Sequence, residues 1–244
     1  MPKLSANPTG PLNSTFGFSG VDIGTLGATE YTLVGLTVDC SGSVAAFSRE
    51  EEAAIKAIVE ACRKSPRADN LMLRYSRFDT NLTEVHGFKL LQDCNPNDYD
   101  NTLPPGGMTA LFDASVDCVD AVARYGADLV KNDFSANGIV FVVTDGCNNV
   151  GKMTVGEVKK SLDRVVPSEA LESLVSVLIG VNVTDPQVAS ALQDFSRQAG
   201  FTQFVNIGDA NAKSLAKLAA FVSKSISSQS NALGTGGPSQ ALTF

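Results

Sequence analysis

Two aspartates and three hydroxyl residues are the side chains whose types and spacing best fit a chemical role. Asp39 is followed by Ser41 and Ser43, Thr109 lies in a Gly-Gly-Met-Thr run, and Asp145 precedes a glycine. All five side chains offer oxygen, the ligand that Mg²⁺ prefers, and a magnesium site usually contains only one or two carboxylates. Each residue alone is more often a turn former or a helix cap. Together they are our candidate metal ligands.

A mostly parallel sheet would bring these residues to one edge. Asp39 follows the apolar run Tyr31 to Val38, and Asp145 ends the run Gly138 to Asp145; both patterns are typical of strands buried on two faces. Further strands are predicted at Leu71 to Phe78, Glu84 to Leu91, Leu174 to Val181 and Phe201 to Ile207. In such sheets ligands bind beyond the carboxyl ends of the strands. The sequence therefore places both aspartates where a site is expected.

Helical patterns separate the strands. Ser48 and Glu51 have the spacing of a capping box, Thr109 precedes an apolar helical stripe, and Asp185-Pro186 is typical of a helix start. Additional helices are predicted from Val155 to Val165 and around Leu215 to Ile226. Alternating strands and helices predict an α/β fold with a doubly wound sheet and helices on both faces.

The two ends of the chain show no sustained period. Residues 1 to 30 are rich in Gly, Pro, Ser and Asn, which predicts an irregular leader, and residues 228 to 244 are Gly/Ser-rich and uncharged, which predicts a flexible tail. The folded domain is therefore expected to span residues 31 to 227. Truncation after Ser228 is expected to leave the melting temperature nearly unchanged.

Composition narrows the class of protein. The chain has 244 residues, 43% of them hydrophobic, and a formal net charge of −7, which argues against a nucleic-acid-binding surface. It contains no run of eighteen apolar residues, as a membrane-spanning helix would need, and its five cysteines include no CxxC pair. A cytoplasmic location is the simplest expectation.

The three motifs together resemble the metal-ion-dependent adhesion site of von Willebrand factor A domains. The resemblance rests on Asp39-x-Ser41-x-Ser43, on the Gly-Gly-Met-Thr run with Thr109, and on Thr-Asp145-Gly, and it covers about residues 31 to 227. It implies that the serines and Thr109 contact Mg²⁺, with Mn²⁺ or Ca²⁺ as substitutes, while the aspartates hold the ion mainly through waters. It also implies a mostly parallel six-stranded sheet with one antiparallel edge strand, for which Glu84 to Leu91 is the candidate.

The resemblance implies a binding protein and not an enzyme. A protein partner would supply a Glu or Asp carboxylate to the ion, and a MoxR-type AAA+ ATPase is one such partner known in the family; neither nucleic acid nor membrane is expected.

Two alternatives stay open: a Mg²⁺-dependent phosphohydrolase, and a structural or assembly protein whose metal only stabilises the fold. A serine hydrolase would have to use His86, the single histidine, but no GxSxG motif accompanies it. Dinucleotide binding is disfavoured because Gly-Thr-Gly-Gly lies in the tail and follows no strand.

Overall fold

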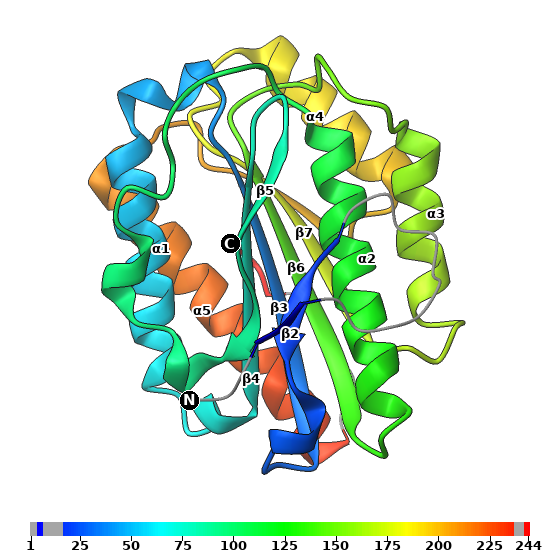
Figure 1. The fold of residues 1–244 in the computed structure, drawn as a ribbon. Helices are drawn as coiled ribbons and strands as arrows, with labels where there is room; N and C mark the ends of the chain where they lie inside the picture. Colours follow the sequence, from blue (N-terminus) through cyan, green and yellow to red (C-terminus); the bar gives the residue numbers. More distant parts are fainter. Residues whose placement is uncertain (1–3, 7–16, 237–241) are drawn as a thin grey trace.

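The computed structural model describes residues 4–6, 17–236 and 242–244, which form a three-layer α/β fold (Figure 1). The described residues contain one eight-stranded sheet with the order β1-β2-β5-β4-β3-β6-β7-β8. Its strands are β1 (Leu4–Ala6), β2 (Ser19–Val21), β3 (Glu30–Asp39), β4 (Leu71–Phe78), β5 (Leu82–Leu90), β6 (Ser135–Thr144), β7 (Leu174–Gly180) and β8 (Gln203–Asn206). Strands β3, β4, β6, β7 and β8 are parallel to their neighbours in that set, as predicted.

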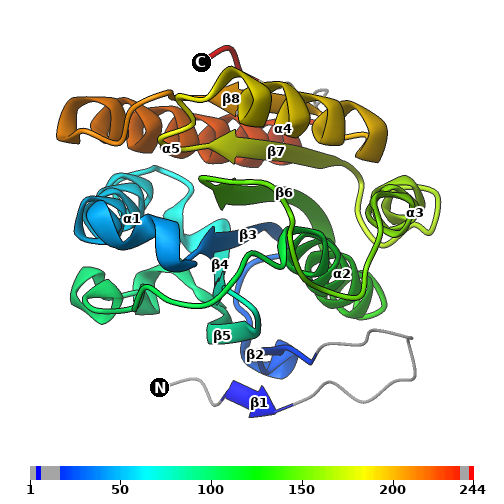
Figure 2. The ribbon, with the colours of Figure 1, turned by 90° about the horizontal axis from the view of Figure 1, so that it is seen from above.

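In the described part of the chain, five α-helices cover the sheet on both faces (Figure 2). They are α1 (Ser48–Arg63), α2 (Leu111–Val130), α3 (Val155–Val165), α4 (Pro186–Ala199) and α5 (Ala212–Thr235). Helices α1 and α5 share one apolar core with the sheet, and α2, α3 and α4 share the other. The doubly wound α/β class expected from the sequence is therefore confirmed.

The strand β5 is antiparallel to β4, as predicted, but it does not form the edge of the sheet. Strand β2 pairs with its outer side through Gly20 and Phe88, and β1 pairs with β2. Gly87 is required at this junction, because a Cβ there would overlap the main chain of Ser19. The sheet therefore contains two strands more than the six expected.

The prediction of an irregular leader is wrong for Leu4–Ala6 and Ser19–Val21, which form β1 and β2. The Ser19 amide and hydroxyl both donate to Glu84 Oε1, at 2.9 and 2.6 Å, and Tyr125 donates to the Val21 carbonyl at 2.8 Å. Phe18 packs edge-on against Phe88 and Tyr125. A segment of only three strand residues leaves no periodic signal, but aromatic contacts and hydrogen bonds anchor it to β5 and α2.

The prediction of a flexible tail from residue 228 is wrong for residues 228 to 235, because α5 continues to Thr235. Gln229 is 1% exposed, and its Nε2 donates to the Gly138 carbonyl and to Ser173 Oγ, both at 3.0 Å. Beyond residues 237–241, which lie outside the described part of the chain, Phe244 packs edge-on against Phe221. Polar side chains thus hold the end of α5 against the rest of the fold. A search for apolar periodicity does not detect such contacts.

The capping box expected at Ser48 and Glu51 does not form. Phe47 is the N-cap of α1, no side chain caps this helix end, and Glu51 is buried. A capping box forms instead at Thr154 and Glu157, ahead of α3. The predicted start of α4 is confirmed, since Asp185 Oδ1 accepts from the Gln187 amide at 2.7 Å.

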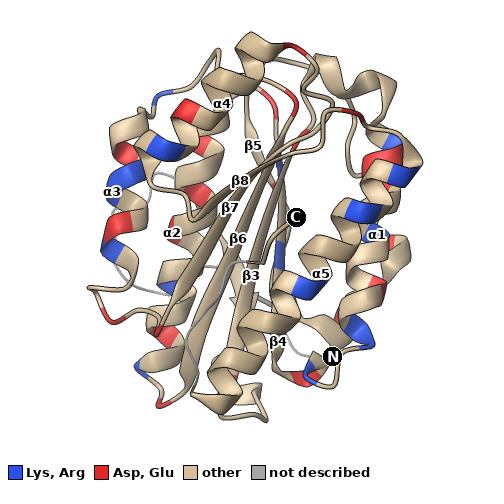
Figure 3. Ribbon diagram, turned by 180° about the vertical axis from the view of Figure 1, so that it is seen from behind, with Lys and Arg blue, Asp and Glu red and all other residues tan. Residues whose placement is uncertain are grey.

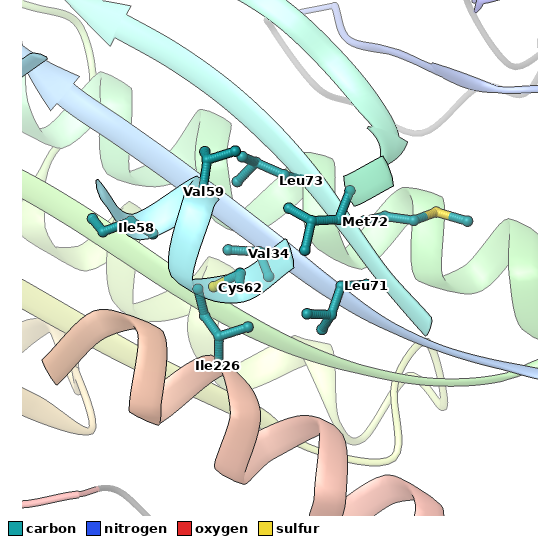
Figure 4. A pocket seen from close by; sticks show the side chains of 9 residues that line it. Val34, Ile58, Val59, Cys62, Leu71, Met72, Leu73 and Ile226 are labelled. Carbon is teal, nitrogen blue, oxygen red and sulfur yellow. The ribbon is translucent and has the colours of Figure 1, made fainter. Parts of the chain in front are cut away.

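A small cavity lies in the core between α1, α5 and the sheet (Figure 4). Its volume is about 10 Å³, and apolar side chains and one thiol line it, among them Val34, Ile58, Cys62 and Ile226. It is too small and too apolar to hold a ligand. None of the helices in the described residues is both long and apolar enough to cross a membrane.

Candidate metal centre

A chain of hydrogen-bonded side chains joins the ends of the neighbouring parallel strands β3 and β6. Ser43 Oγ donates to Asp145 Oδ1 at 2.9 Å, and Ser41 Oγ lies 3.2 Å from Ser43 Oγ. Because the Ser43 proton is directed at Asp145, the Ser41 hydroxyl is left to donate to Ser43 or to Asp39, with which it also forms a side-chain hydrogen bond. Each serine oxygen then keeps a lone pair that is available to a cation.

Asp39 is fully buried at the end of β3 and is held on both oxygens. Its Oδ1 accepts from the Ser41 amide at 2.8 Å, and its Oδ2 accepts from Thr144 Oγ1 at 2.7 Å. These contacts fix the carboxylate and bind it to both β3 and β6. Each oxygen still has acceptor capacity beyond these bonds.

The loop before α2 lies against the serine loop. The Gly106 amide donates to the Cys40 carbonyl at 2.9 Å, and the Gly42 amide donates to the Gly107 carbonyl at 3.3 Å. Gly107 has φ = +71°, and a Cβ there would crowd Thr80 and Asp79. Gly107 therefore permits this close approach of the two loops.

Thr109 is buried beside this loop, two residues before α2 begins. Its main chain is tied to the loop after β6, because the Thr109 amide donates to Asn149 Oδ1 at 2.7 Å and the Asn149 amide donates to the Thr109 carbonyl at 3.0 Å. Hydrogen bonds therefore connect the loop with Ser41 and Ser43, the loop with Thr109 and the loop with Asp145. Asn149 was not among the residues predicted for the site.

Burial makes this end of the sheet an unfavourable place for negative charge. Desolvation raises the pKa of Asp39 to about 6, and it raises the pKa of Asp145 as well. Acidic segments lie in the loops beyond the strand ends (Figure 3). Among the described residues, neither aspartate forms an ion pair with a lysine or arginine.

Glu51, which its spacing from Ser48 predicts to be part of a capping box, is a third acid near this group of residues. It is 4% exposed and its Oε2 has no hydrogen-bond partner. Desolvation raises its pKa well above the usual value, and the charges of Asp39 and Asp145 raise it further. A Ser-x-x-Glu pattern cannot distinguish a capping glutamate from one turned into the interior.

The donor set fits a hard divalent cation. Its potential ligands are all oxygens, from serine, threonine and carboxylate side chains. Among the residues that the structure describes, no positive charge compensates the carboxylates, and a bound cation would provide that charge. No group of three or more His, Cys, Asp or Glu side chains suited to a metal occurs in the part of the chain that the structure describes. The predicted ligands Ser41, Ser43 and Thr109 would add hydroxyl oxygens to the two carboxylates.

His86 takes no part in this group of residues. Its Nδ1 donates to the Gly87 carbonyl and its Nε2 accepts from Tyr99, both at 2.9 Å, and burial lowers its pKa to about 4. The ring is therefore neutral and held by a tyrosine. The contacts do not support a serine hydrolase built on His86.

Comparison with known proteins supports the fold. No protein-family model matches the chain, and no curated protein matches it. Among solved structures, the D319A mutant of the PilB minor pilin from Streptococcus sanguinis is 13% identical with a TM-score of 0.61, over 88% of this chain and 65% of that one. The pilus adhesin SpaC from Lactobacillus rhamnosus GG, in its open conformation, is 12% identical with a TM-score of 0.53, over 82% of this chain and 30% of that one.

A third structure is that of proximal thread matrix protein 1 from the mussel byssus, in which zinc occupies the metal-ion-dependent adhesion site (MIDAS) motif. It is 15% identical with a TM-score of 0.54, over 80% of this chain and 47% of that one. The chain thus spans less than two thirds of the length of these proteins. At this identity the comparisons show the fold alone, and that fold resembles the von Willebrand factor A domain.

Proposed function

We propose that this chain is a metal-ion-dependent protein-binding module without catalytic activity. The observation that carries the proposal is that hydrogen bonds join Ser41, Ser43, Asp39 and Asp145 at one end of the sheet, where the main chain of Thr109 is tied to the loop that follows Asp145. The support from relatives is the zinc-occupied MIDAS motif in the mussel protein of similar fold. We assign Mg²⁺ as the ion because the donors are all oxygen.

The residues divide the work of holding the ion. Ser41, Ser43 and Thr109 present neutral hydroxyl oxygens, whereas Asp39 and Asp145 supply charge and fix the serines through hydrogen bonds. Once bound, the ion can take a further anionic ligand, because the three groups assigned to direct contact with it are neutral hydroxyls. A partner carboxylate complements that charge, and such a charge-assisted contact can dominate a small interface.

Exposed groups around Ser43 leave room for a partner. Gly42, Ser43, Gly107 and Met108 are exposed, and Met108 is 48% exposed. These residues bear no charge that would repel an incoming carboxylate. The partner is therefore a protein that offers Glu or Asp on a protruding segment, and a MoxR-type AAA+ ATPase is the candidate that the family resemblance supplies.

Affinity capture from the native cell tests the proposal. Wild-type protein, Thr109→Ala and wild-type protein in EDTA are compared for retention of a partner, followed by exchange of partner acids for their amides. We expect Thr109→Ala, EDTA and one amide exchange each to abolish retention, without additive effects, because each removes the same contact. Retention by folded Thr109→Ala in EDTA would refute a metal-dependent interface.

A further inference from the structure

The start of α2 is capped from outside the helix. Its N-cap is Ala110, which has no side chain to offer, and the Phe112 amide donates instead to Asn148 Oδ1 at 3.0 Å. The Ala110 amide donates to the Asp79 carbonyl at 2.9 Å. The loop after β6 therefore satisfies the Phe112 amide, and the loop after β4 satisfies the amide of the N-cap residue.

The same loop is held in return by α2. The Asp113 carboxylate accepts from the Lys152 amide at 2.9 Å and from the Met153 amide at 3.2 Å. Gly151 adopts φ = +122° directly against Asp113, where any Cβ would collide with the carboxylate. The loop consequently has little freedom to shift relative to the first turn of α2.

Between these two sets of contacts, Asn149 forms hydrogen bonds with both the amide and the carbonyl of Thr109. Its Oδ1 accepts from the Thr109 amide at 2.7 Å, and its own amide donates to the Thr109 carbonyl at 3.0 Å. Asn149 itself is exposed, whereas Thr109 is 4% exposed. An exposed side chain thus fixes the backbone of a buried candidate ligand.

We propose that Asn149 is a positioning residue, whose side chain holds Thr109 in the orientation that cation binding needs. This inference rests on the proposed function. Loss of the Oδ1 acceptor frees the Thr109 amide, while the backbone hydrogen bond from residue 149 remains. The loop then stays attached, but the Thr109 hydroxyl loses its fixed direction. Outer partners of metal ligands typically change affinity by about 10- to 100-fold.

Calorimetric titration with Mg²⁺ alone tests the inference. Asn149→Leu keeps the approximate shape of the side chain without an acceptor, and we expect it to weaken Mg²⁺ binding about tenfold. Asn149→Asp restores the acceptor and should bind at least as tightly as the wild type. Asn148→Asp places the same negative charge one residue away. It therefore measures how much the added charge alone changes the Mg²⁺ affinity.

Asn148→Leu is the structural control, because it removes a helix cap from the same loop without touching Thr109. We expect it to lower the melting temperature and to leave the Mg²⁺ affinity unchanged. In a Thr109→Ala background, Asn149→Leu should have no further effect on Mg²⁺ affinity, because the group that it positions is gone.

Two results would overturn the inference while leaving the proposed function intact: wild-type affinity in Asn149→Leu, or equal losses in Asn149→Leu and Asn148→Leu. Absence of Mg²⁺ binding by the wild type would instead refute the proposed function, and the role of Asn149 would fall with it.

Discussion

Ser43 and Asp145 are separated by 102 positions in the sequence, yet Ser43 Oγ donates a 2.9 Å hydrogen bond to Asp145 Oδ1. This contact joins the loops that follow the neighbouring parallel strands β3 and β6. It also sets the direction of the Ser43 proton, and so leaves the oxygen lone pair free. The geometry therefore combines a neutral ligand oxygen with a nearby negative charge.

The contribution of Asp39 to the stability of the metal-free protein should fall as pH rises from about 4 to about 7, against the opposite contribution of His86, whose pKa is lowered to about 4. Asp39 has a folded-state pKa of about 6 against an ordinary value of 3.8, so the folded state holds its proton to higher pH than the unfolded state. The difference corresponds to a loss on the order of 3 kcal/mol across that interval. Denaturant unfolding in EDTA at a series of pH values measures it.

The Asp39→Asn variant isolates this contribution, because it lacks the titrating carboxyl, and the stability that it loses between pH 4 and 7 should be smaller than in the wild type by about that amount. Asp39→Asn keeps an acceptor for the Ser41 amide, and Thr144 can direct its hydroxyl to the Gly146 carbonyl, 3.0 Å away. Exposed Asp22→Asn controls for the change in net charge. An Asp39→Asn variant with the slope of the wild type would show that Asp39 does not titrate as its burial requires.

Replacement of Glu51 should stabilise the metal-free protein. Its buried Oε2 has no partner and it faces apolar residues that include Leu36, Ile55 and Val143. Glu51→Met removes this cost, and we expect a gain of about 1–3 kcal/mol in the free energy of unfolding at pH 7.5. Glu50→Met, at the exposed neighbouring position, should change it by less than about 0.5 kcal/mol. A destabilised Glu51→Met would mean that this carboxyl has a stabilising partner.

Truncation after Ser228 should destabilise the protein, contrary to the expectation from composition. It removes the Gln229 side chain with its two hydrogen bonds and the buried Leu233. We expect a loss of about 3 kcal/mol or more, given typical costs of about 2–5 kcal/mol for removing a buried leucine. Truncation after Gly236 keeps both residues and should cost less. Equal melting temperatures for all three lengths would contradict the docking of this helix end.

The sequence predicted the features that depend on local pattern. Buried strands have a continuous apolar signature, so the ends of β3 and β6, and with them Asp39 and Asp145, could be placed from the order of the residues alone. Features that depend on tertiary contacts could not be predicted in this way. The docking of Ser19 on Glu84, the inward turn of Glu51 and the burial of Gln229 all involve polar residues, whose burial depends on partners distant in sequence.

A crystal structure with Mn²⁺, located by its anomalous signal, would test the metal centre most directly. We predict one strong peak in contact with Ser41 Oγ, Ser43 Oγ and Thr109 Oγ1, with the carboxylates of Asp39 and Asp145 within reach through water. The peak should disappear in Asp39→Ala crystals grown in the same way. Absence of a peak among these oxygens at millimolar Mn²⁺, or an undiminished peak there in Asp39→Ala, would contradict the assignment of this group as a metal centre.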